Sequence, residues 1–481
     1  MGRMGSLSSV ALALATVCLC VPSARSDDGS KPPGPPPAGR ESPNQGLPAT
    51  VLAVQSDEKV TPPTFEVALA AARAAAAKAV EPLLDATFHH GKQLVVPDAF
   101  PTIQAAIDAA KSGDVVVVKA GTWFEQLVMK DGVKLVSDVG VDGDEPVPVE
   151  GAVLRLPRRT LRTILDGSKA EASSHGMIDF ANGLGRHTVV DGFTIRNLPK
   201  QNHHLPGHAH GVNVRGASPV IVSCWVHHNG STGIGNHATF RDMGQPLEQR
   251  DFRRANVVDG SEAVIWNNVV SSNFGLGIGC NHYAAPQVLG NEVFGNDDTE
   301  LDGSPTPGIG IKHGAAPNVV GNLVHDNAGG GILTQVGEPA GAQAIDVPSH
   351  PTIVGNVVRA NGRTHPAISA RHAGSEDQPV VISRNVVLDA GAMGIGLVEG
   401  AVGIVEDNLV AGSGPGGIAV HGARALRLDR NRVTGAKGPG FLIVGGATVD
   451  RMTGNAADAN LGPPFVVHDG WIADPRPAKG D

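Results

Sequence analysis

Aromatic side chains are scarce in this 481-residue chain. They make up 4% of it and include a single tyrosine, Tyr283. The core must therefore be built from Val, Ile, Leu and Ala, and the 63 glycines indicate many tight turns. This composition favours short strands joined by turns over an α/β enzyme or a helical bundle. It also disfavours a neutral-sugar site that depends on stacking against aromatic rings.

Basic charge and cysteine are also in short supply. A net charge of −9 argues against nucleic acid as a partner, because nucleic-acid binding needs a concentrated basic field. Two of the four cysteines lie in the N-terminal apolar run, which leaves Cys224 and Cys280. One pair makes no disulfide framework. These two also occupy different positions of the repeat described below, so we expect two free, buried thiols.

The chain has one long apolar run, LSSVALALATVCLCV, which follows Arg3. Small residues at Ala24 and Ser26 would allow cleavage before Asp27, so we expect a signal peptide over residues 1–26 and a secreted or periplasmic protein. The run is short for a membrane span and no comparable run follows it. No membrane span is therefore expected.

The rest of the chain divides by composition. Residues 27–62 are proline-rich and are expected to be a disordered linker. Residues 63–93 favour a helix through their alanines, and we expect this helix to lie against the end of the main domain. The main domain is expected over residues 94–472, followed by a disordered tail over residues 473–481.

Two columns of asparagine reveal an internal repeat. The first column comprises Asn268, Asn291, Asn322, Asn356, Asn385, Asn408, Asn431 and Asn455. The second column, five residues further on, comprises Asn229, Asn273, Asn296, Asn327 and Asn361. The shortest spacing, about 23 residues, is too short for helical hairpins and fits one coil of a β-solenoid. We expect asparagine at the corners, because it tolerates left-handed backbone and its amide can bond the amides above and below it.

A second recurrent segment, "G-I-x-x", lies between the asparagine columns. Period-two alternation places its second and fourth residues inside the solenoid. The inward set comprises Ile234, Ile278, Cys280, Ile309, Ile311, Ile332, Ile368, Leu397 and Val420. The outward third position is mostly small, comprising Asn213, Gly235, Gly279, Gly310, Ser369, Gly396 and Ala419. The fold predicted from the repeat is an all-β solenoid of about 23-residue coils.

Residues 97–130 carry a further pattern, "TIQ-AI-A---GD-V-V--G-Y-E". Its matching residues are Thr102, Ile103, Gln104, Ala106, Ile107, Gly113, Asp114, Val116, Gly121 and Glu125, with Trp123 and Phe124 where a tyrosine is usual. This segment resembles the opening of pectin-lyase-like proteins, and the following coils resemble parallel β-helix repeats of that superfamily. The resemblance implies a single-stranded right-handed parallel β-helix with an N-terminal capping helix, in which Asp114 and Glu125 are architectural.

A basic stripe runs along one face of the predicted solenoid. Its fifth-position residues are Arg215, His237, Asn281, Lys312, Gln335 and Arg371, and its sixth-position residues are His282, His313 and His372, with Tyr283 beside His282. Insertions at 239–259, 337–350 and 374–378 follow the same strand, and another at 297–305 precedes it. We interpret the insertions as walls of a groove with a glycine floor. A basic groove of this kind suits an acidic polysaccharide.

These residues permit lyase chemistry. β-Elimination removes the proton beside a uronate carboxylate, which must first be neutralised by Ca²⁺ or arginine. We predict Lys312 or His313 as the base and Arg371 or Arg215 as the neutralising group. The predicted substrate contacts are Arg215, His237, Asn281, His282, Tyr283, Gln335 and His372. The ordered motif set of β-helix polygalacturonases is absent from the sequence. The hallmarks of pectinesterases and the signature of mannuronan epimerases are also missing.

Two metal hypotheses accompany this prediction. The acidic loop of Asp297, Asp298, Glu300 and Asp302 provides hard oxygen ligands that suit Ca²⁺, although a solvated turn also explains it. The histidines His203, His204, His208, His210, His227 and His228 suit Zn²⁺ or Cu²⁺. Some periplasmic relatives of the fold serve copper-enzyme maturation, but the spacing here matches no metal motif.

Two functional classes therefore remain open. One is an enzyme, such as a polysaccharide lyase, that acts on acidic polysaccharide. The other is a non-catalytic surface or carbohydrate-binding solenoid, with periplasmic metal handling as a third hypothesis. In each case we expect a monomer.

Overall fold

The computed structural model describes residues 59–84, 90–138, 140, 143–149, 152–170, 176–199, 210–245, 249–297, 305–335, 347–362 and 364–474. The expected signal peptide, most of the expected linker and residues 475–481 of the expected tail lie outside these residues. Within them, no helix combines the length and the apolar character that a membrane crossing requires.

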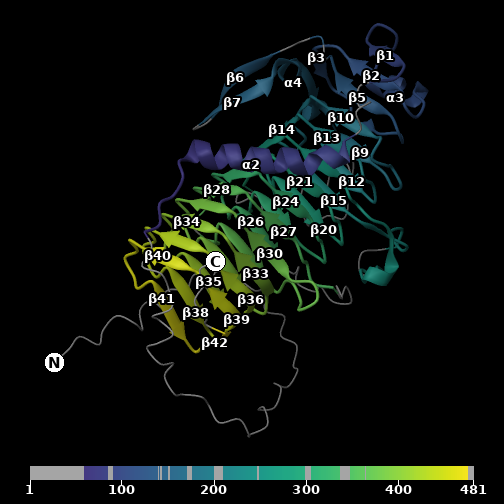
Figure 1. Ribbon diagram of the computed structural model, residues 1–481. Helices are drawn as coiled ribbons and strands as arrows, with labels where there is room; N and C mark the ends of the chain where they lie inside the picture. The colour runs from purple at the N-terminus through teal and green to yellow at the C-terminus, as the bar shows by residue number, and fades with distance from the viewer. Residues whose placement is uncertain are drawn as a thin grey trace, which may run out of the picture.

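Three long parallel sheets wind into one solenoid, because each coil contributes one strand to each sheet (Figure 1). The first sheet contains β1 (Gln93–Val96), β2 (Val115–Val118), β5 (Lys134–Ser137), β10 (Val189–Asp191), β13 (Val220–Val222), β18 (Val264–Trp266), β21 (Gln287–Leu289), β24 (Asn318–Val320), β27 (Thr352–Val354), β30 (Val380–Ser383), β33 (Val402–Glu406), β36 (Arg424–Asp429), β39 (Thr448–Thr453) and β42 (Trp471–Asp474). The second sheet contains β3 (Gly121–Trp123), β8 (Thr163–Asp166), β11 (Thr194–Arg196), β14 (Trp225–His227), β19 (Val269–Ser271), β22 (Glu292–Phe294), β25 (Leu323–His325), β28 (Val357–Arg359), β31 (Val386–Leu388), β34 (Leu409–Ala411), β37 (Arg432–Thr434) and β40 (Ala456–Asp458). The third sheet contains β4 (Leu127–Val128), β9 (Ile178–Phe180), β12 (Val212–Arg215), β15 (Ile234–His237), β20 (Ile278–Asn281), β23 (Ile309–Ile311), β26 (Ile332–Gln335), β29 (Ile368–Arg371), β32 (Ile395–Val398), β35 (Ile418–His421), β38 (Phe441–Val444) and β41 (Phe465–His468).

Identical aliphatic residues stack inside the solenoid. Ile278, Ile309, Ile332 and Ile368 are register partners in successive strands of the third sheet, and all four are fully buried. Full burial of one such side chain contributes about 1.5–3 kcal/mol. The predicted inward set is confirmed, including Cys280, and Cys224 and Cys280 are both free and buried.

The asparagine columns form buried hydrogen-bond ladders. Asn322 Nδ2 donates to Asn356 Oδ1 at 2.9 Å, and Asn322 Oδ1 accepts from Asn291 Nδ2 at 3.0 Å. Their place at the corners is confirmed, but the left-handed residue is the one before the asparagine, such as Gly321 or Asp407. The asparagine itself provides the amide, whose donor and acceptor both find partners in the dry corner.

A short helix closes the N-terminal end of the solenoid. Helix α3 (Ile103–Ala109) buries Ile103, Ala106 and Ile107 in the core. The two carboxylate oxygens of Glu125 accept from the backbone N–H groups of Ile103 and Gln104, each at 3.0 Å. These contacts satisfy N-terminal amides that lack intrahelical partners. The predicted capping helix and the architectural role of Glu125 are confirmed.

The alanine-rich helix lies along the flank of the solenoid. The expectation that it lies against the end of the main domain is therefore wrong. Helix α2 (Phe65–Val80) crosses the corners between the first and second sheets (Figure 1). Its buried residues, Ala68, Ala72, Ala76 and Val80, recur every four positions and form one face. The approach is close because a Cβ at Gly321 would lie 2.1 Å from the Ala72 carbonyl oxygen. Small residues on both elements therefore set the position of the helix.

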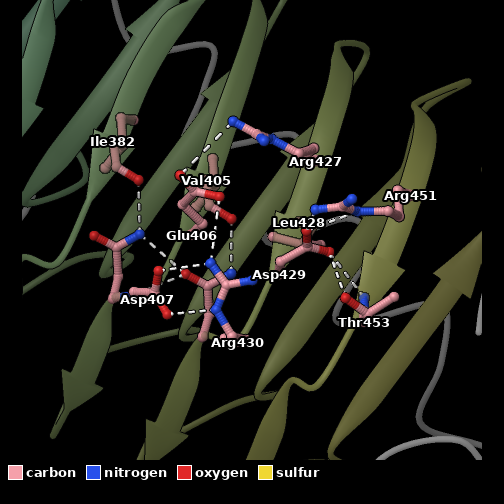
Figure 2. A network of polar contacts seen from close by, with 12 residues as sticks. Ile382, Val405, Glu406, Asp407, Arg427, Leu428, Asp429, Arg430, Arg451 and Thr453 are labelled. Carbon is pink, nitrogen blue, oxygen red and sulfur yellow. Dashed lines mark hydrogen bonds and ion pairs between the residues drawn. The ribbon is translucent and has the colours of Figure 1, made fainter. Parts of the chain in front are cut away.

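Charged residues flank the asparagine ladder in the last coils (Figure 2). Arg430 pairs with Asp407 one coil away, with Nε–Oδ1 and Nη2–Oδ2 distances of 2.7 and 2.8 Å. Asp429 is fully buried and accepts from Thr453 N and Oγ1 and from Arg451 Nε. Because every charge here has a partner in the next coil, the network acts as a set of ionic rungs.

The remaining described elements decorate the solenoid. An antiparallel hairpin comprises β6 (Asp144–Val149) and β7 (Ala152–Pro157), and α4 (Arg158–Arg162) follows it. A second hairpin comprises β16 (Thr239–Phe240) and β17 (Val257–Asp259). The short 3₁₀ helices are η2 (Glu81–Leu83), η3 (Gly167–Lys169) and η5 (Arg254–Asn256).

Candidate functional site

The predicted stripe forms a continuous row on the outer face of the third sheet. Arg215 is the register partner of His237, and Gln335 is the partner of Arg371. Lys312 follows directly after β23, between these two pairs. One coil advances roughly 4.8 Å, so the row runs parallel to the axis of the solenoid.

The glycines of the predicted floor are covered in the first half of the row. A Cβ on Gly235 would meet the His210 ring at 2.1 Å, and a Cβ on Gly310 would meet the Leu276 side chain at 2.8 Å. The turn before each strand thus lays a side chain over the sheet. Glycine is required here for that internal packing, and the expectation of an open floor is wrong for these coils.

Four histidines stack from coil to coil beside the row. His210 Nε2 lies 3.3 Å from His237 Nε2, and His237 Nδ1 lies 3.3 Å from His282 Nδ1. The rings of His282 and His313 follow with centroids 4.6 Å apart. The structure therefore brings together three of the predicted stripe histidines and adds His210.

The β16–β17 hairpin, formed by the insertion at 239–259, covers this histidine stack. Phe240 and Phe252 pack against each other at 5.0 Å, and Phe252 contacts the His282 ring at 5.0 Å. Tyr283, a predicted substrate contact, is 3% exposed and belongs to the same cluster. In a chain so poor in aromatics, this cluster is a small core of its own.

Burial keeps two of these imidazoles neutral. It lowers the pKa of His282 well below its usual value, helped by the neighbouring histidines. Burial and the charge of Lys312 lower the pKa of His313 to about 4. His313 is therefore neutral at pH 7, and its Nδ1 is buried without a hydrogen-bond partner among the described residues.

An open pocket lies further along the same face, over β26, β29, β32 and β35. It encloses about 80 Å³. Its floor is the third-position row, Ser369, Gly396 and Ala419. One wall comes from the turns before the strands, and the other from the strand ends. The first wall comprises Thr364, His365, Pro366, Ala392, Met393 and Pro415, and the second comprises Gln335, Arg371, Val398, Glu399 and His421.

Glu399 is the residue that sequence analysis missed at this pocket. Its Oε2 accepts from Arg371 Nε at 2.6 Å and lies 3.4 Å from His372 Nε2. Arg371, the predicted neutralising group, thus has a carboxylate beside it already. The signal was available, because Glu399 occupies the sixth position one coil after His372. Lys312 and His313, the predicted bases, lie outside the pocket lining.

Most of the proposed metal ligands lie outside the residues that the structure describes. Asp298, Glu300 and Asp302, like His203, His204 and His208, lie outside the described residues, while Asp297 is exposed. His210 faces the third sheet, whereas His227 belongs to β14 of the second. Over the described ranges, no three His, Cys, Asp or Glu side chains could together hold a metal ion.

Comparison with known proteins supports the fold. Residues 182–338 match the family model described as a right handed beta helix region. The comparison with curated proteins gives no match.

Solved structures of carbohydrate enzymes resemble the chain weakly. The mannuronan C-5 epimerase AlgE6 A-module of Azotobacter vinelandii is 15% identical over 79% of this chain and 95% of its own, with a TM-score of 0.36. An α-1,3-glucanase of family GH87 from Streptomyces thermodiastaticus is 16% identical over 79% and 67%, with a TM-score of 0.42. A family 28 exopolygalacturonase of Yersinia enterocolitica is 11% identical over 80% and 78%, with a TM-score of 0.36. Scores at this level carry no argument about function. The winding of the three sheets and the capped N-terminal end, together with the family match over residues 182–338, identify the fold as a right-handed parallel β-helix.

Proposed function

We propose that the protein binds an acidic polysaccharide along the outer face of the third sheet, outside the cytoplasm. The carrying observation is the pocket around Arg371 and Glu399, where the floor opens between an apolar wall and a polar wall. Concave sites with a few convergent polar groups are the usual form of a ligand site. The enzymes named above act on saccharides, which agrees with this proposal without carrying it.

Different charged residues along the row contribute differently to ligand binding. The opposite charges of Arg371 and Glu399 cancel, so this pair gives the pocket no net charge that would favour an acidic ligand. Preference for an acidic polymer rests on Lys312 and Arg215, whose coils precede the pocket. Lys312 lies two coils from Arg371, roughly 10 Å along the axis. An extended chain that occupies the pocket would therefore pass beside it.

Cleavage by β-elimination is the second candidate function. Lys312 and His313 are the proposed bases; His313 is neutral at pH 7, but its pKa of about 4 makes it the weaker proton acceptor of the two. Arg371 would have to neutralise a substrate carboxylate while Glu399 holds its Nε. Ca²⁺ supplied from solution would perform the same task.

The test is binding of uronate, sulfated and neutral polysaccharides, with and without Ca²⁺, followed by ultraviolet detection of an unsaturated product. We expect R371A to weaken binding about tenfold, the equivalent of about 1.4 kcal/mol, and K312A to weaken only acidic polymers and reduce their salt dependence. Arg384, an exposed arginine outside this face, provides the matched control variant R384A. Retention of no polysaccharide would refute the proposal. A product that persists in both K312A and H313A would refute the assignment of the base.

A further inference from the structure

The pocket combines an apolar wall with a charge pair, and the apolar wall suits an apolar group of the ligand. Pro366, Met393 and Pro415 line one side, and Met393 packs with Ala419 of the floor in a small apolar cluster. Beside His365, this wall is made mainly of small and aliphatic side chains, so it offers a surface for a compact apolar group. A carboxylate would gain nothing from this wall and would meet Glu399 opposite.

The polar wall offers one donor group and one acceptor side by side. Arg371 makes one hydrogen bond in the described part of the chain, through Nε. Glu399 uses Oε2 for both Arg371 and His372, and the described residues give its Oε1 no partner. The outer guanidinium nitrogens and Oε1 thus remain able to donate to and accept from a ligand. His421 adds a buried Nδ1 that has no partner among the described residues.

These two walls complement an acetamido group. Its carbonyl oxygen accepts from Arg371, its N–H donates to Glu399, and its methyl group contacts Met393 and Pro366. The cavity of about 80 Å³ is several times the roughly 10–15 Å³ that one water needs by the same kind of measure, so a group of four heavy atoms fits. A pair of hydroxyl groups would satisfy the polar wall but would leave the apolar wall unused.

We infer that the pocket binds the N-acetyl group of a 2-acetamido sugar, an inference that rests on the saccharide-binding function proposed above. Together with Lys312, this assigns the protein to polymers that combine a carboxylate sugar with an acetamido sugar. The acetamido group occupies the pocket, and the carboxylate lies toward Lys312.

The test uses two uncharged ligands that differ at the acetamido position. Calorimetry would compare N-acetylated chito-oligosaccharides with cello-oligosaccharides of equal length. We expect the acetylated ligand to bind at least tenfold more tightly, and hyaluronan, which adds a carboxylate, to bind more tightly still. Equal affinity for the chito- and cello-oligosaccharides overturns the acetamido inference and leaves saccharide binding standing. Binding of neither oligosaccharide nor of any acidic polymer overturns both.

Variants separate pocket contacts from folding. At Gly396 an added Cβ would lie 3.0 Å from Pro366 Cγ, and the backbone there is not left-handed, so G396A narrows the pocket by displacing this proline ring. We expect G396A and M393A each to reduce the preference for the acetylated ligand over the cello-oligosaccharide about fivefold or more. Thermal unfolding of each variant checks that the fold is retained. If both variants keep wild-type selectivity, the acetyl group does not occupy this pocket.

Discussion

Replacing Asn322 by alanine should remove the central rung of the corner ladder. Its side chain makes four hydrogen bonds, from Nδ2 to Asn356 Oδ1 and Val288 O, and to Oδ1 from the backbone and side-chain amides of Asn291, all at 2.9–3.0 Å. The residue is fully buried, so water cannot replace the lost partners. At about 1 kcal/mol for each bond, we expect N322A to lower the free energy of unfolding by about 4 kcal/mol. The backbone N–H of Asn291 is left without its acceptor.

Chemical denaturation with circular dichroism measures this loss, and amide hydrogen exchange locates it. The control is N318A in the same coil, because Asn318 is half-buried and its side chain makes a single hydrogen bond within the described residues, from Nδ2 to Gln287 Oε1 at 3.1 Å. We expect N318A to change stability by less than about 1 kcal/mol. Exchange should accelerate in N322A at the amide of Asn291 and in the flanking coils. If N322A and N318A are equally stable, the ladder does not stabilise the solenoid and the reasoning fails.

Three further results are expected. G321A forces a left-handed residue with a Cβ against the Ala72 carbonyl, so it should cost about 1–3 kcal/mol and should increase hydrogen exchange in α2; unchanged exchange would show that the helix does not depend on this contact. Hydrogen bonding and the charge of Arg430 lower the pKa of Asp407, so this pair stabilises the fold above the ordinary carboxyl pKa and loses that contribution as the pH falls through the lowered value; D407N should flatten the acid limb of a stability–pH curve, and an identical curve would contradict the ionic rung. Burial raises the pKa of the Cys280 thiol, so a thiol reagent should label it only after unfolding, and rapid labelling of native protein would disprove its burial.

Period and corner chemistry made the fold predictable. An amide that recurs about every 23 residues has one simple explanation, and Asn322 and its equivalents occupy the corners as expected. The role of the left-handed position was misassigned by one residue, because Gly321 and Asn322 are adjacent in the same corner. The flank position of α2 was not predicted, because a run of alanines favours a helix but does not show which surface the helix packs against. That surface includes the glycines that precede the corner asparagines, such as Gly321.

The order of the residues along the candidate site could be predicted from the sequence, but the shape of the surface that they line could not. Alternation predicts Arg371 and Lys312 on the outside, and both residues are partly exposed. Whether the floor is open depends on the turn before each strand, and neither Leu276 nor His210 falls within the strand pattern that was compared. The pairing of Glu399 with Arg371 depends on which residues are neighbours in adjacent coils. Those neighbours are set by coil register and are not apparent from position along the chain.

The placement of α2 also constrains how the molecule assembles. Val60 donates to Asp458 in the last complete coil at 3.1 Å, and from there the helix runs back until Val80 packs against Val189. The segment that precedes the solenoid in sequence therefore runs antiparallel to the order of the coils, from the last coils toward the first. Contacts at such sequence separation cannot form until most coils exist. During synthesis α2 would emerge first and dock last, and once docked it would join coils that otherwise touch only their neighbours into one cooperative unit.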